Sequence, residues 1–357
     1  MAPVINALKR HSKEFCFIAT GQHHDYEMAM RFIEELSLPT PEYSFQLQSS
    51  SPTSQIGEMM SKLEGALQSS ASRLILVQGD TNSMLAAALT GVKMGLTVAH
   101  IEAGLRSYDW RMPEEHNRRM VDHVSDVLFA PTQTSMQNLT NEGVYGKIVI
   151  TGNTVVDSVN HYLPLALKTS HVMNRISFNE FCLATIHRKE NVDSSETLRD
   201  LVAALLEIGT PVVFPVHPRT ETRLREFGLY EKTFSSPNIL PLPPISYADS
   251  LILQKNCKFI LTDSGGLQEE ATVPSIRKPV ILLRSSTERP EGIETGFTKL
   301  AGVNRDKILS LAKQLLKSPP QLPSLSPFGD GKAGERIVDT IENGLFVPEP
   351  TVSPHPS

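Results

Sequence analysis

Residues 258–270 read KFILTDSGGLQEE and combine an apolar run, a Ser-Gly-Gly turn and two carboxylates. The apolar run predicts a parallel strand, and Ser264 is a favourable N-cap for a helix that begins near Gly265. Gly265 and Gly266 allow a ligand to approach the main chain, where free N–H groups and the positive helix end favour an anion. The two glutamates follow within the helix, where a carboxylate can accept hydrogen bonds from sugar hydroxyls. We interpret the turn as a binding site for a nucleotide or sugar phosphate; the alternative is a tight turn whose glycines serve only packing.

Three carboxylates follow expected strands or begin a helix in the first half of the chain: Asp80, Glu102 and Glu114. Each has a structural alternative, namely the N-cap of the next helix for Asp80, an ion pair with Arg106 for Glu102, and a favourable interaction with the helix dipole for Glu114. Together they supply the groups that acid/base chemistry on a bound sugar nucleotide needs.

Histidine and arginine side chains follow two expected strands in the second half. His187 stands next to Arg188, and His217 lies two residues before Arg219. Histidine transfers protons near neutral pH or donates to a leaving phosphate, and arginine supplies positive charge. Arg289, beyond a later strand, is a candidate partner for a phosphate or carboxylate. For His217 taken by itself, a structural role is at least as well supported as a role in binding or proton transfer.

The remaining composition excludes several classes of protein. With 34 basic and 39 acidic residues, the net charge of −5 gives no reason to expect binding to nucleic acid or an anionic membrane. Cys16, Cys182 and Cys257 are too few and too far apart for a disulfide framework or a cysteine metal site, which indicates the cytoplasm. The sequence shows no membrane span and no signal-peptide pattern. The segment 23–25, His-His-Asp, lacks the helical spacing of metal ligands, so we expect no metal.

Strand and helix patterns alternate along the whole chain, which predicts parallel sheets with crossover helices on both faces. We therefore assign the chain to the α/β class. In the first half we expect strands at 15–20, 74–78, 98–102, 127–130 and 147–151, and helices at 1–9, 25–36, 54–68, 82–94, 113–124, 133–142 and 154–167. In the second half we expect strands at 182–186, 211–216, 239–242, 258–262 and 280–284, and helices at 194–208, 222–227, 247–255, 306–316 and 331–341.

A polar stretch after residue 167 interrupts this pattern, and we place the domain boundary there. The first domain then comprises residues 1–167 and the second comprises residues 168–330. The proline- and serine-rich residues 346–357 predict a disordered tail.

These motifs together resemble the non-hydrolysing UDP-N-acetylglucosamine 2-epimerase family. The similarity runs to residue 341 through GDT at 79–81, HIEAGLR at 100–106, PEE at 113–115, TGNT at 151–154, HR at 187–188, PVH at 215–217, TDSGGLQEE at 262–270, TERPE at 287–291 and PFGDG at 327–331. The resemblance implies two Rossmann-like domains facing a cleft, the architecture of glycosyltransferase-B enzymes. The C-terminal helix, 331–344, would join the first domain.

The resemblance also implies an activity. Family members interconvert UDP-GlcNAc and UDP-ManNAc, in nucleotide-sugar metabolism and polysaccharide biosynthesis, without NAD or another cofactor. UDP is eliminated across C1–C2 to give 2-acetamidoglucal and is then added back with a proton on the opposite face of C2. Because the C2 hydrogen is not acidic in the substrate, the C1–O bond must weaken first, so groups that stabilise the leaving diphosphate drive the reaction. A homodimer is a further family expectation.

By motif, the resemblance assigns the carboxylate roles to Asp80, Glu102 and Glu114, and places His187 near the departing diphosphate. The substrate-binding residues would be Arg188, His217, Ser264, Gly265, Gly266, Glu270 and Arg289, with Glu270 on the ribose and Arg289 closing the site. Which carboxylate removes the C2 proton stays open.

Two departures from the family pattern bear on activity. Family members begin with a strand and a Gly-Thr-Arg-Pro-Glu loop, whereas residue 1 of this chain corresponds to a position in the helix after that loop. We therefore expect impaired folding or activity, or an upstream start, and a catalytically impaired UDP-sugar binder is one alternative function. Segment 272–278 is about two residues longer than usual and contains Pro274, which favours a short helix behind the phosphate turn. Another alternative is an epimerase of the same family that acts on a diacetamido uronic acid UDP-sugar.

Overall fold

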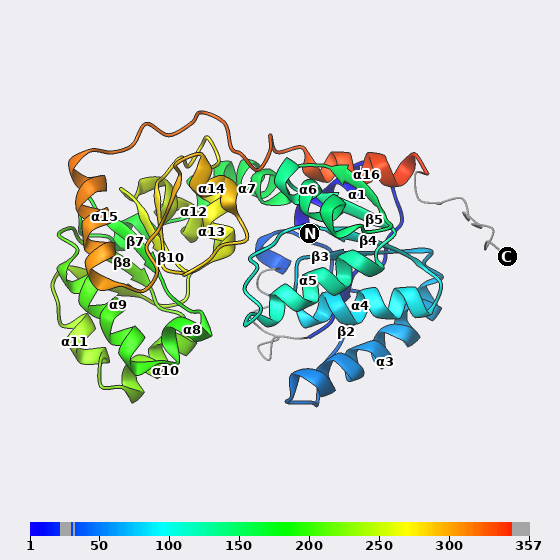
Figure 1. The fold of residues 1–357 in the computed structure, drawn as a ribbon, viewed down its shortest axis with the longest axis horizontal. Helices are drawn as coiled ribbons and strands as arrows, with labels where there is room; N and C mark the ends of the chain where they lie inside the picture. Colours follow the sequence, from blue (N-terminus) through cyan, green and yellow to red (C-terminus); the bar gives the residue numbers. More distant parts are fainter. Residues whose placement is uncertain (22–29, 31–32, 345–357) are drawn as a thin grey trace. The chain divides into compact units, whose positions relative to one another are not determined.

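The computed structural model describes residues 1–21, 30 and 33–344. The chain divides into two compact units (Figure 1). The first consists of Met1–Thr154 and the chain from Gly331 onward, and the second is Val155–Asp330. The division therefore lies at the start of helix α7 (Thr154–Thr169), whereas the sequence pattern placed the boundary after residue 167. Helix α7 packs within the second unit, where the ring of Tyr162 meets that of Tyr247 edge to face with 5.9 Å between centroids.

The first unit is built on a four-stranded parallel sheet in the order β3-β4-β5-β6. The strands are β3 (Leu74–Gln78), β4 (Thr97–Ile101), β5 (Val127–Ala130) and β6 (Lys147–Ile150), and a separate parallel pair joins β1 (Ile18–Ala19) to β2 (Tyr43–Ser44). Every residue of β5 is buried, as expected for an apolar run between two helical layers. The helices of this unit whose bounds lie within the described residues are α1 (Ala2–Arg10), α3 (Pro52–Ser70), α4 (Asn82–Lys93), α5 (Pro113–Val124), α6 (Gln133–Glu142) and α16 (Ala333–Glu342).

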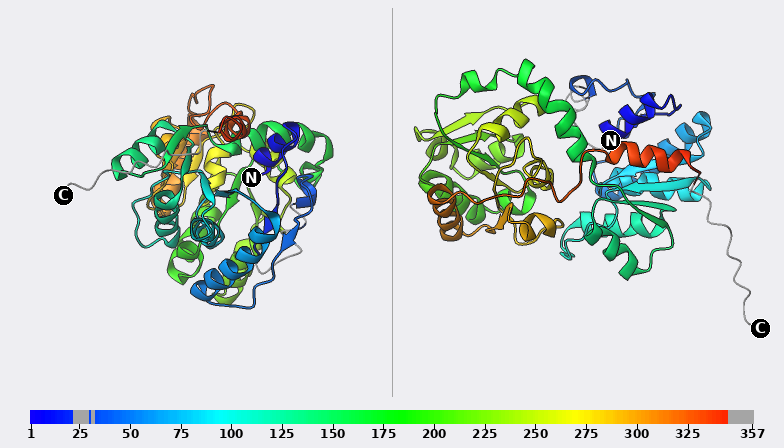
Figure 2. Two further views of the ribbon diagram at one scale, coloured as in Figure 1. Left: turned by 90° about the vertical axis from the view of Figure 1, so that its right-hand side faces the viewer. Right: turned by 90° about the horizontal axis from the view of Figure 1, so that it is seen from above.

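Helices α1 and α16, from opposite ends of the sequence, lie side by side in the first unit (Figure 2). Val4 and Ala7 of α1 and Ile337 of α16 share one apolar core with Phe129 of β5. A side chain at Gly334 would lie 2.9 Å from the carbonyl oxygen of Pro3, so a residue without a side chain permits this close approach. The C-terminal helix is thus an integral part of the first unit.

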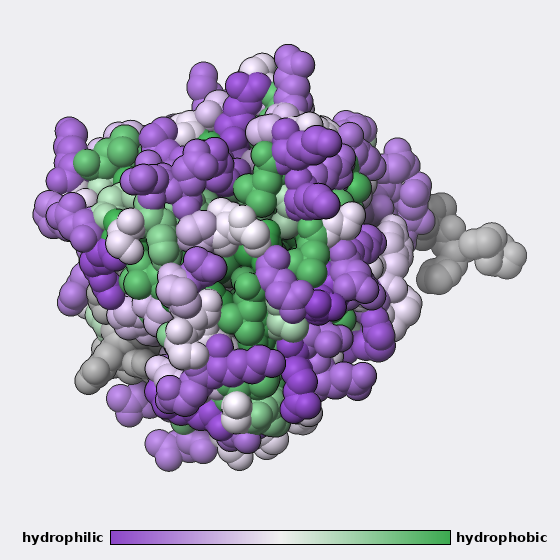
Figure 3. All heavy atoms as spheres, turned by 90° about the vertical axis from the view of Figure 1, so that its left-hand side faces the viewer, coloured by the Kyte–Doolittle hydropathy of each residue, from purple (hydrophilic) through white to green (hydrophobic). Residues whose placement is uncertain are grey.

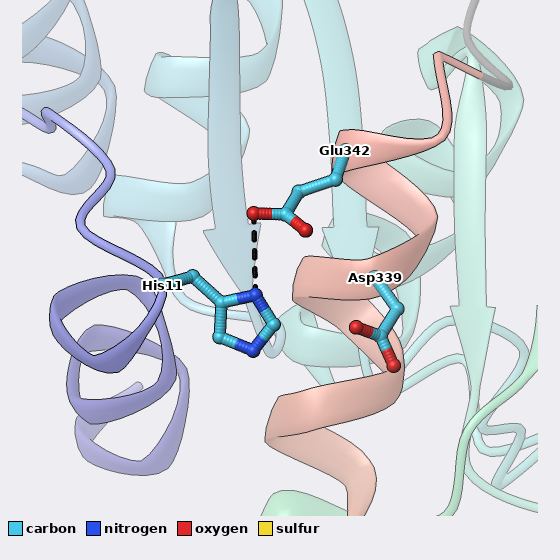
Figure 4. Close-up of side chains that lie close together, drawn as sticks. All are labelled: His11, Asp339 and Glu342. Carbon is cyan, nitrogen blue, oxygen red and sulfur yellow. Dashed lines mark ion pairs between the residues drawn. The ribbon is translucent and has the colours of Figure 1, made fainter.

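Charged side chains also link these two helices (Figure 4). His11 follows α1, and its two ring nitrogens face carboxylates of α16: Nε2 lies 2.8 Å from Glu335 and Nδ1 lies 3.2 Å from Glu342. Asp339 approaches the same histidine. Hydrogen bonds to Glu335 and Glu342 raise the pKa of His11 above its usual 6.5.

The second unit contains a six-stranded parallel sheet in the order β12-β11-β10-β7-β8-β9. The strands are β7 (Cys182–Thr185), β8 (Val212–Pro215), β9 (Ile239–Leu242), β10 (Ile260–Thr262), β11 (Val280–Leu282) and β12 (Thr298–Leu300). From β7 the chain builds outward in one direction and from β10 in the other, which is the strand order of the Rossmann fold. In such sheets, ligands bind beyond the carboxyl ends of the strands where the order reverses, here between β7 and β10.

Helices cover both faces of this sheet around an apolar core that includes Phe214, Phe259 and Leu261. Besides α7 they are the 3-10 helix η1 (Val172–Arg175), α8 (Lys189–Val192), α9 (Ser195–Glu207), α10 (Pro218–Glu226), α11 (Tyr230–Phe234), α12 (Tyr247–Asn256), α13 (Gly265–Glu270), α14 (Pro290–Glu294) and α15 (Arg305–Lys317). Seen from the side of α9, α11 and α15, hydrophilic side chains dominate the surface and apolar ones reach it in separate patches (Figure 3).

The expected α/β architecture is confirmed, with differences in detail. The strand expected at 15–20 is only Ile18–Ala19, and the helix expected at 222–227 begins four residues earlier, with Pro218 in its first turn. The sequence pattern missed short elements such as β2, β12, α8, α11 and α14. The helix at 25–36, the His-His-Asp segment at 23–25 and the tail at 346–357 fall wholly or partly outside the described residues. Within residues 1–21, 30 and 33–344, no helix combines the length and apolar character that a membrane span needs.

Candidate functional site

His187 and Asp263 meet at the point where the strand order of the second unit reverses. Strands β7 and β10 are neighbours, with Thr185 opposite Thr262 in the register, so the residues that follow each strand emerge together. His187 Nδ1 lies 3.0 Å from a carboxylate oxygen of Asp263. The sequence had singled out His187 but not Asp263, although an aspartate directly after a buried strand was a signal for it.

Asp263 is a fully buried carboxylate that accepts hydrogen bonds from several donors. The backbone N–H groups of His187 and Arg188 each donate a hydrogen bond of 2.9 Å to it, and Asn191 Nδ2 donates one of 3.0 Å. Burial alone would raise its pKa, but the bonds from His187 and these N–H groups outweigh burial and hold the pKa below its usual value. The ionised carboxylate keeps a proton on His187 Nδ1, and Nε2, which has no partner among the described residues, is available to a ligand.

His217 lies beside His187, with 5.6 Å between ring centroids. Its Nδ1 accepts a hydrogen bond of 3.1 Å from the backbone N–H of Arg219 and so caps helix α10. The structural role that the sequence allowed for His217 is therefore present. Burial, followed by the proximity of His187 and Arg219, lowers the pKa of His217, so near pH 7 the ring is neutral with its proton on Nε2. Arg188 has a carboxylate of Glu190 at 3.6 Å.

The turn after β10 has the expected strand-to-helix form. Ser264 occupies the N-cap position of α13, but its side chain makes no capping hydrogen bond, and its hydroxyl has no partner in the described part of the chain. Gly266 has no atom within 4 Å of the position that a side chain would take. At Gly265 the same position lies 2.6 Å from Arg289 Nη1. The guanidinium of Arg289 therefore packs directly against this turn.

Two carboxylates hold Arg289 in place. Its Nε lies 2.9 Å from Glu269, and its Nη1 contacts Glu288, which also pairs with Arg284 at 2.9 Å. All four side chains are buried. Glu269, which the sequence offered as a sugar-binding carboxylate, instead pairs with Arg289. The arrangement fixes a positive charge beside Gly265, at the first turn of α13.

Glu270 is the last residue of the short helix α13, and its side chain is buried. Its carboxylate accepts a hydrogen bond of 2.6 Å from Gln254. Burial raises the pKa of Glu270 to about 7, although hydrogen bonds from Gln254 and Tyr247 act in the opposite direction. The residue is therefore close to the midpoint of its titration near neutral pH, and its charge responds to any ligand that donates hydrogen bonds to it.

In the first unit, Asp80 lies in the turn between β3 and α4. Thr81, not Asp80, holds the N-cap position of α4, so the capping alternative for Asp80 is wrong. Its carboxylate pairs with Arg118 of α5 at 2.5 Å, and the side-chain amide of Asn117 binds its carbonyl oxygen at 3.0 Å. The sequence had not indicated Arg118, which lies four residues after Glu114 on the same helix.

Glu102 follows β4 in a backbone conformation that is unusual for a residue with a side chain. Its φ of +70° lies in the left-handed region, which costs a non-glycine residue roughly 1–3 kcal/mol and is most often found at functional sites. Gln78 donates a hydrogen bond of 2.7 Å to its carboxylate. The alternative pairing of Glu102 with Arg106 is wrong, because Arg106 instead binds Asp122 and Glu142, each at 2.7 Å.

Glu114 and Glu115 begin helix α5 and differ sharply in their contacts. Glu115 is buried and accepts hydrogen bonds from Ser107 N at 2.9 Å and from Arg118 at 2.5 Å, so it anchors the preceding loop. Burial would raise the pKa of Glu115, but these donors lower it overall. Glu114 is half-buried, and its carboxylate has no hydrogen-bond or ion-pair partner among the residues that the structure describes. Of the pair, Glu114 is the carboxylate available for chemistry.

The chain is similar to known proteins over nearly its whole length. A family model described as UDP-N-acetylglucosamine 2-epimerase matches residues 6–342. The chain is 41% identical over 357 residues to the UDP-N-acetylglucosamine 2-epimerase of Methanocaldococcus jannaschii, covering 97% of this chain and 96% of that one. It is 37% identical over 330 residues to the UDP-2,3-diacetamido-2,3-dideoxy-D-glucuronate 2-epimerase of Pseudomonas aeruginosa, covering 91% and 90% of the two chains. The fold is similar to the crystal structure of the Methanocaldococcus jannaschii enzyme in complex with UDP-GlcNAc and UDP, with a TM-score of 0.89 over 96% of each chain.

Proposed function

The chain belongs to the UDP-N-acetylglucosamine 2-epimerase family and acts as an isomerase on UDP-N-acetylglucosamine, and we propose that it inverts C2 by eliminating UDP and adding it back. The product of the forward direction is UDP-ManNAc. The observation that carries this mechanism is the pairing of His187 with the buried carboxylate of Asp263 beside the Ser264 turn.

In the elimination step, the bond between C1 and the bridging oxygen breaks, and its electron pair leaves with UDP. A carboxylate takes the C2 proton, and the C–H electron pair becomes the C1–C2 double bond of 2-acetamidoglucal. In the return step, an oxygen of the β-phosphate attacks C1 while a proton is delivered to the opposite face of C2. Each step transfers a proton and the diphosphate but no hydride, so the reaction requires no nicotinamide.

The second unit supplies the groups that stabilise the departing diphosphate. The Nε2 of His187 donates to the β-phosphate, as does the N–H donor of His217. The phosphates are bound by the hydroxyl of Ser264, the main chain of Gly265 and Gly266, and the fixed charge of Arg289. Hydrogen-bond donors and positive charge placed where negative charge develops lower the barrier to elimination. Arg188 is a second source of positive charge for the phosphates. Glu270 binds the ribose hydroxyls.

The first unit supplies the carboxylates for the two proton transfers: Asp80, Glu102 and Glu114. Arg118 holds Asp80 and Gln78 holds Glu102, whereas Glu114 is unpaired among the described residues. Opposite faces of C2 require two separate carboxylates, because one group cannot reach both faces of the ring in a single bound orientation.

The similarity to the relative from Pseudomonas aeruginosa, which is named as an epimerase of a diacetamido uronic acid UDP-sugar, supports a second candidate substrate. That sugar differs from GlcNAc at C3 and C6 and leaves the reaction at C1 and C2 unchanged. Comparing kcat/KM for the two UDP-sugars tests this alternative. A higher kcat/KM for the diacetamido uronic acid UDP-sugar would identify that sugar nucleotide as the substrate in place of UDP-GlcNAc.

We further propose that the protein is a cytoplasmic homodimer. The location is supported by its three cysteines, all at described positions, which are free thiols. The dimer is an expectation from the family resemblance, and sedimentation of the purified chain tests it.

The proposed mechanism is tested by incubating the protein with UDP-GlcNAc in deuterated water. We expect deuterium at C2 of the recovered UDP-sugars, free UDP only in traces, and loss of exchange in Asp80→Asn and Glu114→Gln. Glu64→Gln on the exposed face of α3 is the matched control and should exchange like the wild type. Release of free sugar would indicate hydrolysis, and tight binding without exchange would indicate a UDP-sugar binder.

A further inference from the structure

His100, the first residue of the HIEAGLR motif, is a buried histidine that the mechanism above does not use. It lies on β4 and is fully inaccessible to solvent. Its Nε2 lies 2.9 Å from the carbonyl oxygen of Gly79, and its Nδ1 lies 2.7 Å from Asp122, a buried carboxylate of α5.

The two partners of the His100 ring are both hydrogen-bond acceptors. A carbonyl oxygen only accepts hydrogen bonds, so Nε2 must carry a proton. Burial would raise the pKa of Asp122, but His100 and Arg106 lower it overall, so the carboxylate is ionised and also accepts. Both ring nitrogens of His100 therefore face hydrogen-bond acceptors, and the two contacts hold the ring in one orientation.

His100 and Asp122 fix two turns at the same edge of the sheet. His100 binds the carbonyl of Gly79, which immediately precedes Asp80, and Asp122 accepts a hydrogen bond of 3.2 Å from the N–H of Gly104, two residues after Glu102. Both glycines have positive φ values, +85° and +84°. One ion pair thus holds the backbone beside two of the candidate catalytic carboxylates.

The ion pair is part of a closed ring of alternating charges. From His100 and Asp122 the contacts continue through Arg106, Glu142, Arg119, Glu115 and Arg118 to Asp80, each at 3.2 Å or less, and Asp80 is joined covalently to Gly79. Four basic side chains, His100 among them, alternate with four acidic side chains in this network. Removal of the His100 side chain would take one partner from the buried carboxylate of Asp122, which is costly.

We propose that His100 is a positioning residue for the epimerase reaction, fixing the Gly79-Asp80 and Glu102-Gly104 turns so that their carboxylates meet C2. The inference rests on the proposed function, in which these carboxylates transfer the C2 proton. A displacement of a catalytic group by about 1 Å lowers the rate by roughly 100-fold. A merely structural histidine would affect the rate only through the fraction of folded protein.

A matched pair of substitutions separates the two contacts of the His100 imidazole, one with Asp122 and one with Gly79. In His100→Asn the amide can reach Asp122 but not Gly79, whereas in His100→Gln it can reach the Gly79 carbonyl. We expect His100→Asn to lower kcat roughly 100-fold, with the affinity for UDP unchanged because the second unit binds UDP. His100→Gln should recover part of this loss.

The control is Thr90→Val, which removes the buried bond from the Thr90 hydroxyl to Ala86 O on α4. It should lower the melting temperature of the folded protein and leave kcat unchanged. Equal kcat in wild type and both His100 variants, or losses that only follow the melting temperature as in the control, would overturn the inference. An inactive wild type would instead overturn the proposed function and the inference that rests on it.

Discussion

Gly265→Ala tests whether the packing of Arg289 defines the phosphate turn. The added Cβ would lie 2.6 Å from Arg289 Nη1, 2.8 Å from its Cζ and 3.1 Å from Glu288 Oε1. The guanidinium cannot move away cheaply, because Glu269 binds it at 2.9 Å and Glu288 binds it from the other side. A local overpacking of this kind costs about 1–3 kcal/mol.

This cost converts into a measurable change in melting temperature. For a unit the size of Val155–Asp330, each 1 kcal/mol corresponds to a shift of roughly 2–4 °C, so Gly265→Ala should melt about 2–12 °C below the wild type. The displaced arginine should also weaken UDP binding, which calorimetric titration measures.

Gly266→Ala is the matched control, because no atom lies within 4 Å of its added side chain. Alanine favours a helix over glycine by up to about 1 kcal/mol, so this variant should melt at or above the wild-type temperature without ligand. If phosphates approach the main chain at Gly266, the stabilisation by UDP should shrink. A Gly265→Ala variant that melts like the wild type, or a Gly266→Ala variant that is the less stable of the two, would refute the account of the turn.

Three further predictions concern charge. Asp263→Asn places an amide among donors that need an acceptor, so it should lower the free energy of unfolding by about 3–5 kcal/mol in denaturant titrations. It should also lower kcat more than it lowers the affinity for UDP. A variant as stable as the wild type would contradict this prediction. Because Glu270 has a pKa of about 7 and ribose hydroxyls favour its ionised form, UDP binding at pH 7 should release protons, measured by titration calorimetry in two buffers, and Glu270→Gln should abolish the release. Since the pKa of His11 is raised above 6.5 and those of Glu335 and Glu342 are lowered below 4.5, the pairing of α1 with α16 should be strongest between these values. It should weaken as the pH rises through the His11 pKa; hydrogen exchange in α1 measures this, and His11→Gln should remove the dependence.

The fold was predictable where local patterns are strong. Strands 74–78 and 127–130 and helices 113–124 and 133–142 have the expected bounds, because apolar runs, Pro113 and the Thr132 cap mark their ends. Helix α13 is short, as Pro274 suggested, and ends at Glu270. Strand β12 (Thr-Lys-Leu) lacks an apolar run, and the five-residue helix α14 is too short to show a helical period, so the sequence does not mark either element.

The partners of the site residues were not predictable, because they are set by tertiary structure. His187 and Asp263 stand 76 positions apart, and only the neighbouring places of β7 and β10 in the sheet bring them together. Arg106 lies four residues after Glu102, yet its side chain pairs with Asp122 and Glu142 instead. The sequence indicated Asp80 and Glu102 but not Arg118 and Gln78, the residues that hold them.

The central claim is that the C1–O bond of the UDP-sugar breaks and forms again during epimerisation. It is tested most directly with UDP-GlcNAc that carries ¹⁸O in the oxygen bridging C1 and the β-phosphate. Elimination frees this oxygen to exchange places with the other β-phosphate oxygens before the return step. The account predicts that the label in the recovered UDP-sugars becomes distributed between bridging and non-bridging positions as C2 is inverted. Inversion of C2 with all of the label still in the bridge would contradict it.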